Sequence, residues 1–169
     1  MNEGVGSTTI IVIIMVFITV VSAYLAYNVN YTKAFRMKNK IIAMYEKADG
    51  HCDPGTECRT TIAQYAEEIG YAGDTLNCDN NPYKPTGSSL ISKERVESSY
   101  QGKKVSYCVY KMKGDTTGTS GDDLIDPNKP QYYFRVVTSI DIQIPIVQNV
   151  FNLRWLNVTG DTKLFEMTN

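Results

Sequence analysis

The stretch that decides the fold is TTIIVIIMVFITVVSAYLAY, residues 8–27, which contains no charged side chain. An α-helix rises 1.5 Å per residue, so about twenty residues span roughly 30 Å, the thickness of a bilayer's hydrocarbon core. A cleaved signal peptide would need a basic segment before a shorter apolar run. Residues 1–7 instead contain Glu3 and no lysine or arginine. The stretch therefore predicts a single membrane-spanning helix after a short leader or cytoplasmic tail.

The helix is expected to continue beyond residue 27, because residues 28–47 contain no proline or glycine. Apolar side chains in this extension recur at helical spacing, at Ala34, Met37, Ile41, Met44 and Tyr45. Much of the opposite side is basic, with Lys33, Arg36, Lys40 and Lys47. Asp49-Gly50 predicts the end of the helix. We expect residues 28–48 to be an amphipathic extension that packs its apolar stripe against one domain, residues 49–169.

All four cysteines follow the apolar stretch, at positions 52, 58, 78 and 108. Disulfides stabilise small domains in oxidising compartments, so we expect the domain to lie outside the cell. Three pairings are possible. We favour Cys52–Cys58, around an Asp-Pro-Gly turn, and Cys78–Cys108. The basic residues after the span oppose this orientation, because lysine and arginine are enriched on the cytoplasmic side of spans.

The domain begins with helical and loop-rich segments. Thr60 or Thr61 can cap a short helix that runs through Ile69 and ends at Gly70. Residues 72–103 are rich in loop-forming side chains, and residues 92–100 could form a helical turn or more.

The strand signals lie in the second half of the domain. Residues 104–112 alternate, with Val105, Tyr107 and Val109 on one face and Cys108 on the other. Residues 132–144 alternate most cleanly, which predicts one face buried against the long helix. The last strand is expected at 151–165, with a bulge near Trp155 where the alternation changes phase. The fold class is therefore α+β: a long helix packed on a small antiparallel sheet of about three strands.

No combination of residues predicts catalysis or a cofactor. The only histidine, His51, lies beside two cysteines, but no CxxC pair supports a zinc site. Charged residues at 94, 95 and 97 predict a solvated face rather than an acid–base pair. The loop between the first two strands carries oxygen ligands of the type that calcium takes, although their spacing is not that of an EF-hand: Asp115, Asp122, Asp123 and Asp126. A net charge of −1 argues against a nucleic-acid partner.

The order of segments resembles that of type IV pilin-like proteins. It is most similar to the TadE-like minor pseudopilins of tight-adherence (Tad) pilus systems in Gram-positive bacteria. The resemblance rests on Gly6 before the apolar run and on four later segments: YNVNYTKAFRMKNKII (27–42), EIGY (68–71), YCV (107–109), and YYFRVVTSIDIQIPI with VTGDTK between 132 and 163.

The resemblance implies a structural protein rather than an enzyme. Its leader would be cut between Gly6 and Ser7, with Gly4-Val5 as a second option. Its apolar helix would pack in lipid against other pilin-like subunits during pilus assembly, adhesion or secretion. Such proteins usually carry glutamate at the fifth position after the cut, where this chain has Ile11. This departure favours a minor or uncleaved component over a major filament subunit. The alternative is a membrane-tethered extracellular module that binds a ligand or a cell-wall component.

Overall fold

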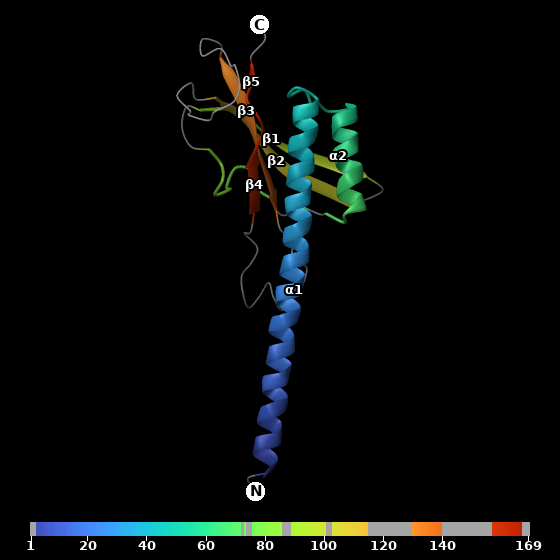
Figure 1. The fold of residues 1–169 in the computed structure, drawn as a ribbon, viewed down its shortest axis with the longest axis vertical. Helices are drawn as coiled ribbons and strands as arrows, with labels where there is room; N and C mark the ends of the chain where they lie inside the picture. The colour runs from blue at the N-terminus through green and yellow to red at the C-terminus, as the bar shows by residue number, and fades with distance from the viewer. Residues whose placement is uncertain are drawn as a thin grey trace.

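The computed structural model describes residues 3–71, 73, 76–85, 89–100, 103–114, 130–139 and 157–166. A long N-terminal helix packs on an antiparallel sheet, which confirms the α+β class (Figure 1). The elements are α1 (Glu3–Lys47), α2 (Glu57–Glu68), β1 (Leu90–Tyr100), β2 (Lys103–Lys113), β3 (Gln131–Ser139), β4 (Asn157–Asp161) and β5 (Phe165–Glu166). The sheet has five strands, where the sequence predicts about three.

Helix α1 is continuous over 45 residues, a length of about 67 Å. It ends at the predicted place, where Asp49 and Gly50 adopt positive φ angles of 47° and 81°. The Gly50 amide donates to the Tyr45 carbonyl oxygen at 2.9 Å and closes the last turn. A Cβ atom on Gly50 would lie 3.0 Å from the Tyr132 hydroxyl. Glycine therefore satisfies both the left-handed backbone and the close approach of β3.

Helix α2 begins at Glu57 with Thr56 in the N-cap position, so the prediction of a cap at Thr60 or Thr61 is wrong. The earlier start follows from the turn before it. The Thr56 hydroxyl donates to the Asp53 carbonyl oxygen at 2.7 Å, and the first helical turn is joined by a disulfide to the chain before that turn. The predicted end is confirmed, because Gly70 follows the helix with a φ of 63°.

The prediction of a helical turn at residues 92–100 is wrong, because this segment is most of β1. Strand β1 pairs antiparallel with β2 from Leu90 opposite Met112 to Tyr100 opposite Lys103. Val96 is buried in the core opposite Tyr107. Pairing with a strongly β-forming neighbour outweighs the helix propensity of the charged residues in this segment, since strand preference depends on packing context.

The sheet, in the order β1-β2-β3-β4 with β5 beside β3, carries an apolar cluster on each of its faces. The two helices cover one face, α1 over β3 and β4 and α2 over β1 and β2. The other face carries a smaller apolar cluster. Side chains along β2 alternate between the two faces of the sheet as predicted, with Val105, Tyr107 and Val109 under the helices and Cys108 on the far side.

The second predicted strand, over 132–144, is described only as far as Ser139, and that part is a strand. Its alternate residues Tyr132, Phe134 and Val136 face the helices, as predicted. The last predicted strand, 151–165, is described only from residue 157 onward, and there it is divided into β4 and β5 by residues 162–164, which are not strand. The proposed bulge near Trp155 and residues 140–144 lie outside the described residues.

A candidate membrane anchor joined to a stapled domain

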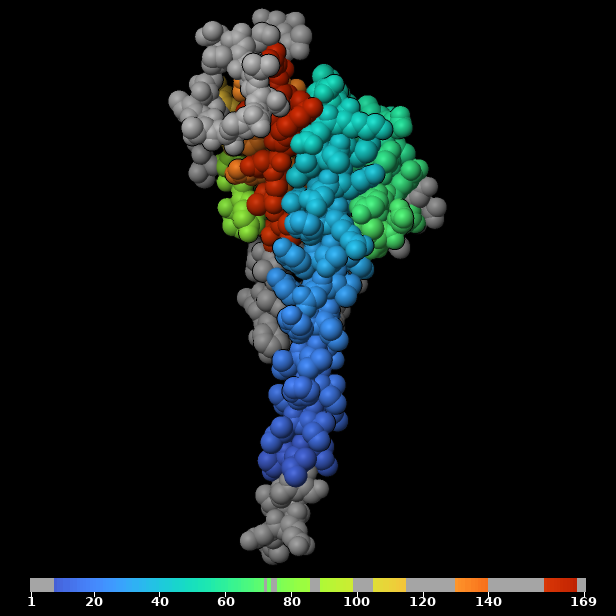
Figure 2. Space-filling model, in the orientation of Figure 1, coloured from blue at the N-terminus to red at the C-terminus, as the bar shows by residue number. Residues whose placement is uncertain are grey.

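The N-terminal half of α1 projects from the domain (Figure 2), and between residues 8 and 25 only Ala23 is buried. Its large apolar side chains are exposed by between 39% and 67%, at Ile10, Ile11, Val12, Ile13, Ile14, Met15, Val16, Phe17, Ile18, Val20, Val21, Tyr24, Leu25 and Val29. Such continuous apolar exposure marks an interaction surface. By length and composition this is the one described helix able to cross a membrane, and it therefore fits a single-pass anchor.

Polar side chains on this projecting half bond to their own helix. The Thr19 hydroxyl donates to the Met15 carbonyl oxygen at 2.8 Å. Three further side chains repeat this pattern four residues back, Asn28 to Tyr24, Asn30 to Ala26 and Thr32 to Asn28, at 2.8 to 3.0 Å. A polar group in lipid is costly unless it is hydrogen-bonded. These bonds therefore make the segment compatible with the bilayer and its interface.

An aromatic row marks the end of the apolar half. The ring centroids of Tyr27 and Tyr31 are 6.1 Å apart, and those of Tyr31 and Phe35 are 6.3 Å apart. Tyrosine favours the interface between hydrocarbon and water, because its ring is apolar and its hydroxyl is polar. The row therefore fits the level at which α1 leaves the membrane.

The distal half of α1 is built into the domain core. Ala34, Met37, Ile41 and Tyr45 are buried against the sheet, with at most 3% of each side chain exposed. This is the stripe that the sequence predicts, apart from Met44, which is only partly buried. Because the projecting half and the buried half belong to one uninterrupted helix, no loop separates the anchor from the domain.

Two contacts fix how closely α1 approaches the sheet. The buried Thr138 hydroxyl of β3 donates to the Ala34 carbonyl oxygen at 3.0 Å. At Gly160 of β4, a Cβ atom would lie 2.9 Å from both the Ile42 Cδ1 and the Lys38 Cδ atoms. The absence of a side chain at this position therefore lets the helix pack close to β4.

The short disulfide, Cys52–Cys58, joins the chain after α1 to the first turn of α2. Arg59 strengthens this connection between the loop after α1 and helix α2. Its Nε donates to the Cys52 carbonyl oxygen at 2.6 Å, and its NH2 group lies 2.7 Å from both carboxylate oxygens of Glu94 on β1. The hydrogen-bonded Glu94 carboxylate helps to keep the pKa of the Arg59 guanidinium above its usual value, although burial alone would lower it. Arg59 thereby connects the disulfide loop, α2 and the sheet.

Two tyrosines lie buried near this guanidinium. Burial raises the pKa of Tyr45 to about 12, against a smaller opposing effect of Arg59. Burial likewise raises the pKa of Tyr107, whose hydroxyl has no hydrogen-bond partner among the described residues. Both hydroxyls therefore stay protonated at neutral pH. Their pKa values therefore lie far from the neutral range that is most efficient for general acid–base catalysis.

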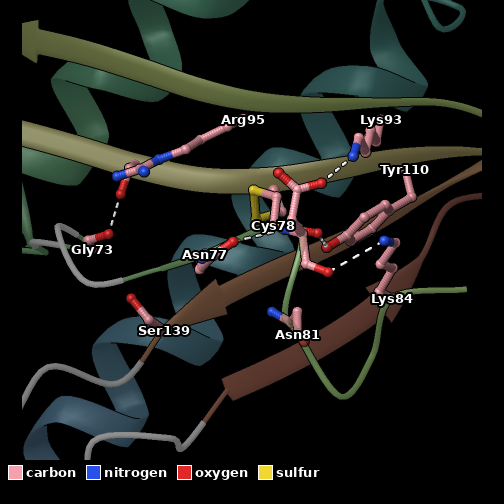
Figure 3. Close-up of a disulfide and its surroundings, with 12 residues drawn as sticks. Gly73, Asn77, Cys78, Asn81, Lys84, Lys93, Arg95, Tyr110 and Ser139 are labelled. Atoms are coloured by element: carbon pink, nitrogen blue, oxygen red, sulfur yellow. Dashed lines mark hydrogen bonds and ion pairs between the residues drawn. A yellow bond between two sulfur atoms is a disulfide. The ribbon is translucent and has the colours of Figure 1, made fainter.

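The long disulfide, Cys78–Cys108, fixes the segment around residue 78 to the far face of the sheet (Figure 3). The Tyr110 hydroxyl donates to the Cys78 carbonyl oxygen at 2.8 Å. The Asn77 side-chain oxygen accepts a hydrogen bond from the backbone amide of Asp79 at 2.8 Å. The Asp79 carboxylate pairs with Lys93 of β1. This segment forms neither a helix nor a strand. The disulfide, the hydrogen bonds and the ion pair hold it against the sheet.

The two disulfides are the pairs favoured from the sequence, and the described residues contain no free cysteine. Gly6 lies inside α1, and the proposed cut before Ser7 stays a prediction. His51 is exposed, with its Nδ1 3.1 Å from the Asp49 carbonyl oxygen. The calcium candidates at 115, 122, 123 and 126 lie outside the described residues.

The charged residues of β1 have more specific roles than a solvated face. Glu94 is half-exposed but binds Arg59, whereas Arg95 and Glu97 pair with each other at 3.0 Å on the exposed side. Arg59 was not predicted as a functional residue, although its position directly after Cys58 is a usable signal. Within the described ranges, no group of three or more His, Cys, Asp or Glu residues could hold a metal ion.

Comparison with known proteins adds no relative: no protein-family model, curated protein or solved structure matches the chain.

Proposed function

We propose that this chain is a membrane-anchored, pilin-like structural subunit of the minor pseudopilin type. The observation that carries the proposal is the division of α1, whose exposed apolar half continues without a break into the core of a disulfide-stapled domain. A helix of this form can anchor the chain in lipid and offer its outer surface to similar helices. The domain then acts as a headpiece outside the cell.

Lateral association would occur between apolar helices within the membrane. In lipid, helices associate through close packing and hydrogen bonding rather than through the hydrophobic effect. The Thr19 and Asn28 side chains are bonded within the helix, which leaves close packing of the exposed apolar side chains as the main contact between helices. We therefore place the subunit contacts on residues 8–27 and assign adhesion or secretion functions to the assembly as a whole.

Photo-crosslinking in cells tests this assignment. A photoreactive phenylalanine analogue at Phe17, which is 67% exposed in the projecting half, should form crosslinks to pilin-like subunits or to a second copy of the chain. The matched control is the same analogue at Tyr83, which is 40% exposed in the headpiece. Crosslinks at position 17 to lipid alone, with a monomeric chain, would contradict the proposal and favour a tethered binding module.

A further inference from the structure

Four cations surround α1 just beyond the apolar stretch, and we call Lys33, Arg36, Lys38 and Lys40 the basic collar. Between Glu3 and Glu46, the helix contains no acidic residue. In the part of the chain that the structure describes, no carboxylate pairs with a collar residue. In the headpiece, by contrast, Arg59 and Arg135 each pair with a carboxylate at 2.7 to 2.8 Å. The collar therefore has positive charge that the described part of the protein does not neutralise.

The collar lies at the level of lipid head groups if residues 8–27 span the hydrocarbon core. Along α1, Lys33 is about 9 Å and Arg36 about 14 Å beyond Tyr27. Side chains of a helix lean toward its N-terminus, which here is the direction of the membrane. Long basic side chains can extend further while their apolar stems stay against the protein. Lys33 and Arg36 can therefore approach lipid phosphates, with Lys38 and Lys40 about one and a half and two turns beyond Lys33.

Local contacts hold the lysines of the collar without neutralising their charge. Lys33 Nζ donates to the Gly70 carbonyl oxygen at 3.3 Å, at the end of α2. Lys38 Nζ lies 4.4 Å from the ring centroid of Phe35, and Lys40 Nζ lies 5.4 Å from that of Tyr65. Arg36 is exposed. The arrangement thus combines three positioned ammonium groups with one exposed guanidinium, the group best suited to bidentate contact with a phosphate.

We propose that the basic collar binds the head groups of anionic phospholipids, with Arg36 and Lys33 in contact with phosphate. Lys38 and Lys40 strengthen the attraction at longer range. A lipid partner fits better than an acidic protein because the aromatic row of Tyr27, Tyr31 and Phe35 places the collar beside the interface. The inference rests on the proposed membrane anchor. Its consequence is a headpiece held close to an anionic membrane surface.

Lipid selectivity of the full-length chain tests the proposal. The chain is reconstituted in vesicles of phosphatidylcholine with a minor share of phosphatidylglycerol, and spin-labelled versions of each lipid are added in separate samples. Lipid that contacts the protein gives an immobilised spectral component. We expect phosphatidylglycerol to be favoured over phosphatidylcholine by about fivefold at low salt, the effect of roughly one cation at the surface. Added salt should reduce this preference.

The variant R36Q identifies the cation responsible. Arg36 is exposed, so its replacement should leave the fold intact while at least halving the preference. The matched control is K47Q, which removes an exposed charge about 16 Å further from the membrane along the same helix and should leave the preference unchanged. Equal association of the two lipids with the wild-type chain, or a preference that R36Q does not lower, would overturn the collar as a lipid site. Complete absence of an immobilised component would instead overturn the anchor itself.

Discussion

The substitution Ile41→Ala tests whether the distal half of α1 is the core of the headpiece. Ile41 has 0% of its side chain exposed and belongs to the main apolar cluster. Truncating a fully buried isoleucine costs about 2–5 kcal/mol, through lost burial and the cavity left behind. A domain of this size typically has 5–15 kcal/mol of stability. A loss of about 3 kcal/mol should therefore lower the headpiece melting temperature by roughly 10 °C.

The assay is thermal unfolding of the full-length chain in detergent, followed by the near-ultraviolet circular dichroism of its core tyrosines. The matched control is Ile14→Ala, since Ile14 is 51% exposed in the projecting half. It should change the headpiece melting temperature by less than about 2 °C, because surface substitutions usually stay within 0.5 kcal/mol. Equal effects of the two substitutions, or no effect of Ile41→Ala, would refute the division of α1 into an anchor and a core.

Three further predictions concern the headpiece. Replacing both cysteines of the long disulfide by serine should lower the free energy of unfolding by about 4 kcal/mol, against about 2 kcal/mol for the short disulfide, because closing the longer loop removes more entropy from the unfolded chain. Chemical denaturation measures both losses, and a larger loss for the short disulfide would contradict this prediction. Burial raises the pKa of Tyr45 to about 12, so stability should be constant below about pH 10, where an unfolded tyrosine titrates, and fall toward pH 12. Tyr45→Phe should reduce that alkaline loss, and an unchanged pH profile would argue against its burial. Thr138→Val removes the hydrogen bond to the Ala34 carbonyl oxygen and should cost about 1 kcal/mol; a stabilised variant would show that this bond is dispensable.

The long helix could be predicted from the sequence because its signals are local. An unbroken apolar run, a helical stripe from Ala34 to Tyr45 and a terminal Asp49-Gly50 each fix a feature of α1 without reference to distant residues. The same holds for β2 and for the described part of β3, whose strict alternation gives their buried faces.

Features that depend on distant partners could not be read in this way. The segment of β1 has only Val96 as a buried apolar residue between its ends, and it becomes a strand because β2 lies beside it. The start of α2 depends on a covalent bond to Cys52. Arg59 gains its role only when folding brings Glu94 within 2.7 Å. The need for glycine at position 160 likewise becomes visible only when folding brings α1 close to β4.

The most direct test of the central claim is the location of the headpiece relative to the membrane. The described residues contain no free cysteine, so Ser92→Cys adds a unique thiol at an exposed position on β1. A membrane-impermeant maleimide is applied to whole cells and to lysed cells, with the wild-type chain as the unlabelled control. An anchored headpiece outside the cell predicts equal labelling of the variant in both samples. Labelling only after lysis would place the domain in the cytoplasm and contradict the account.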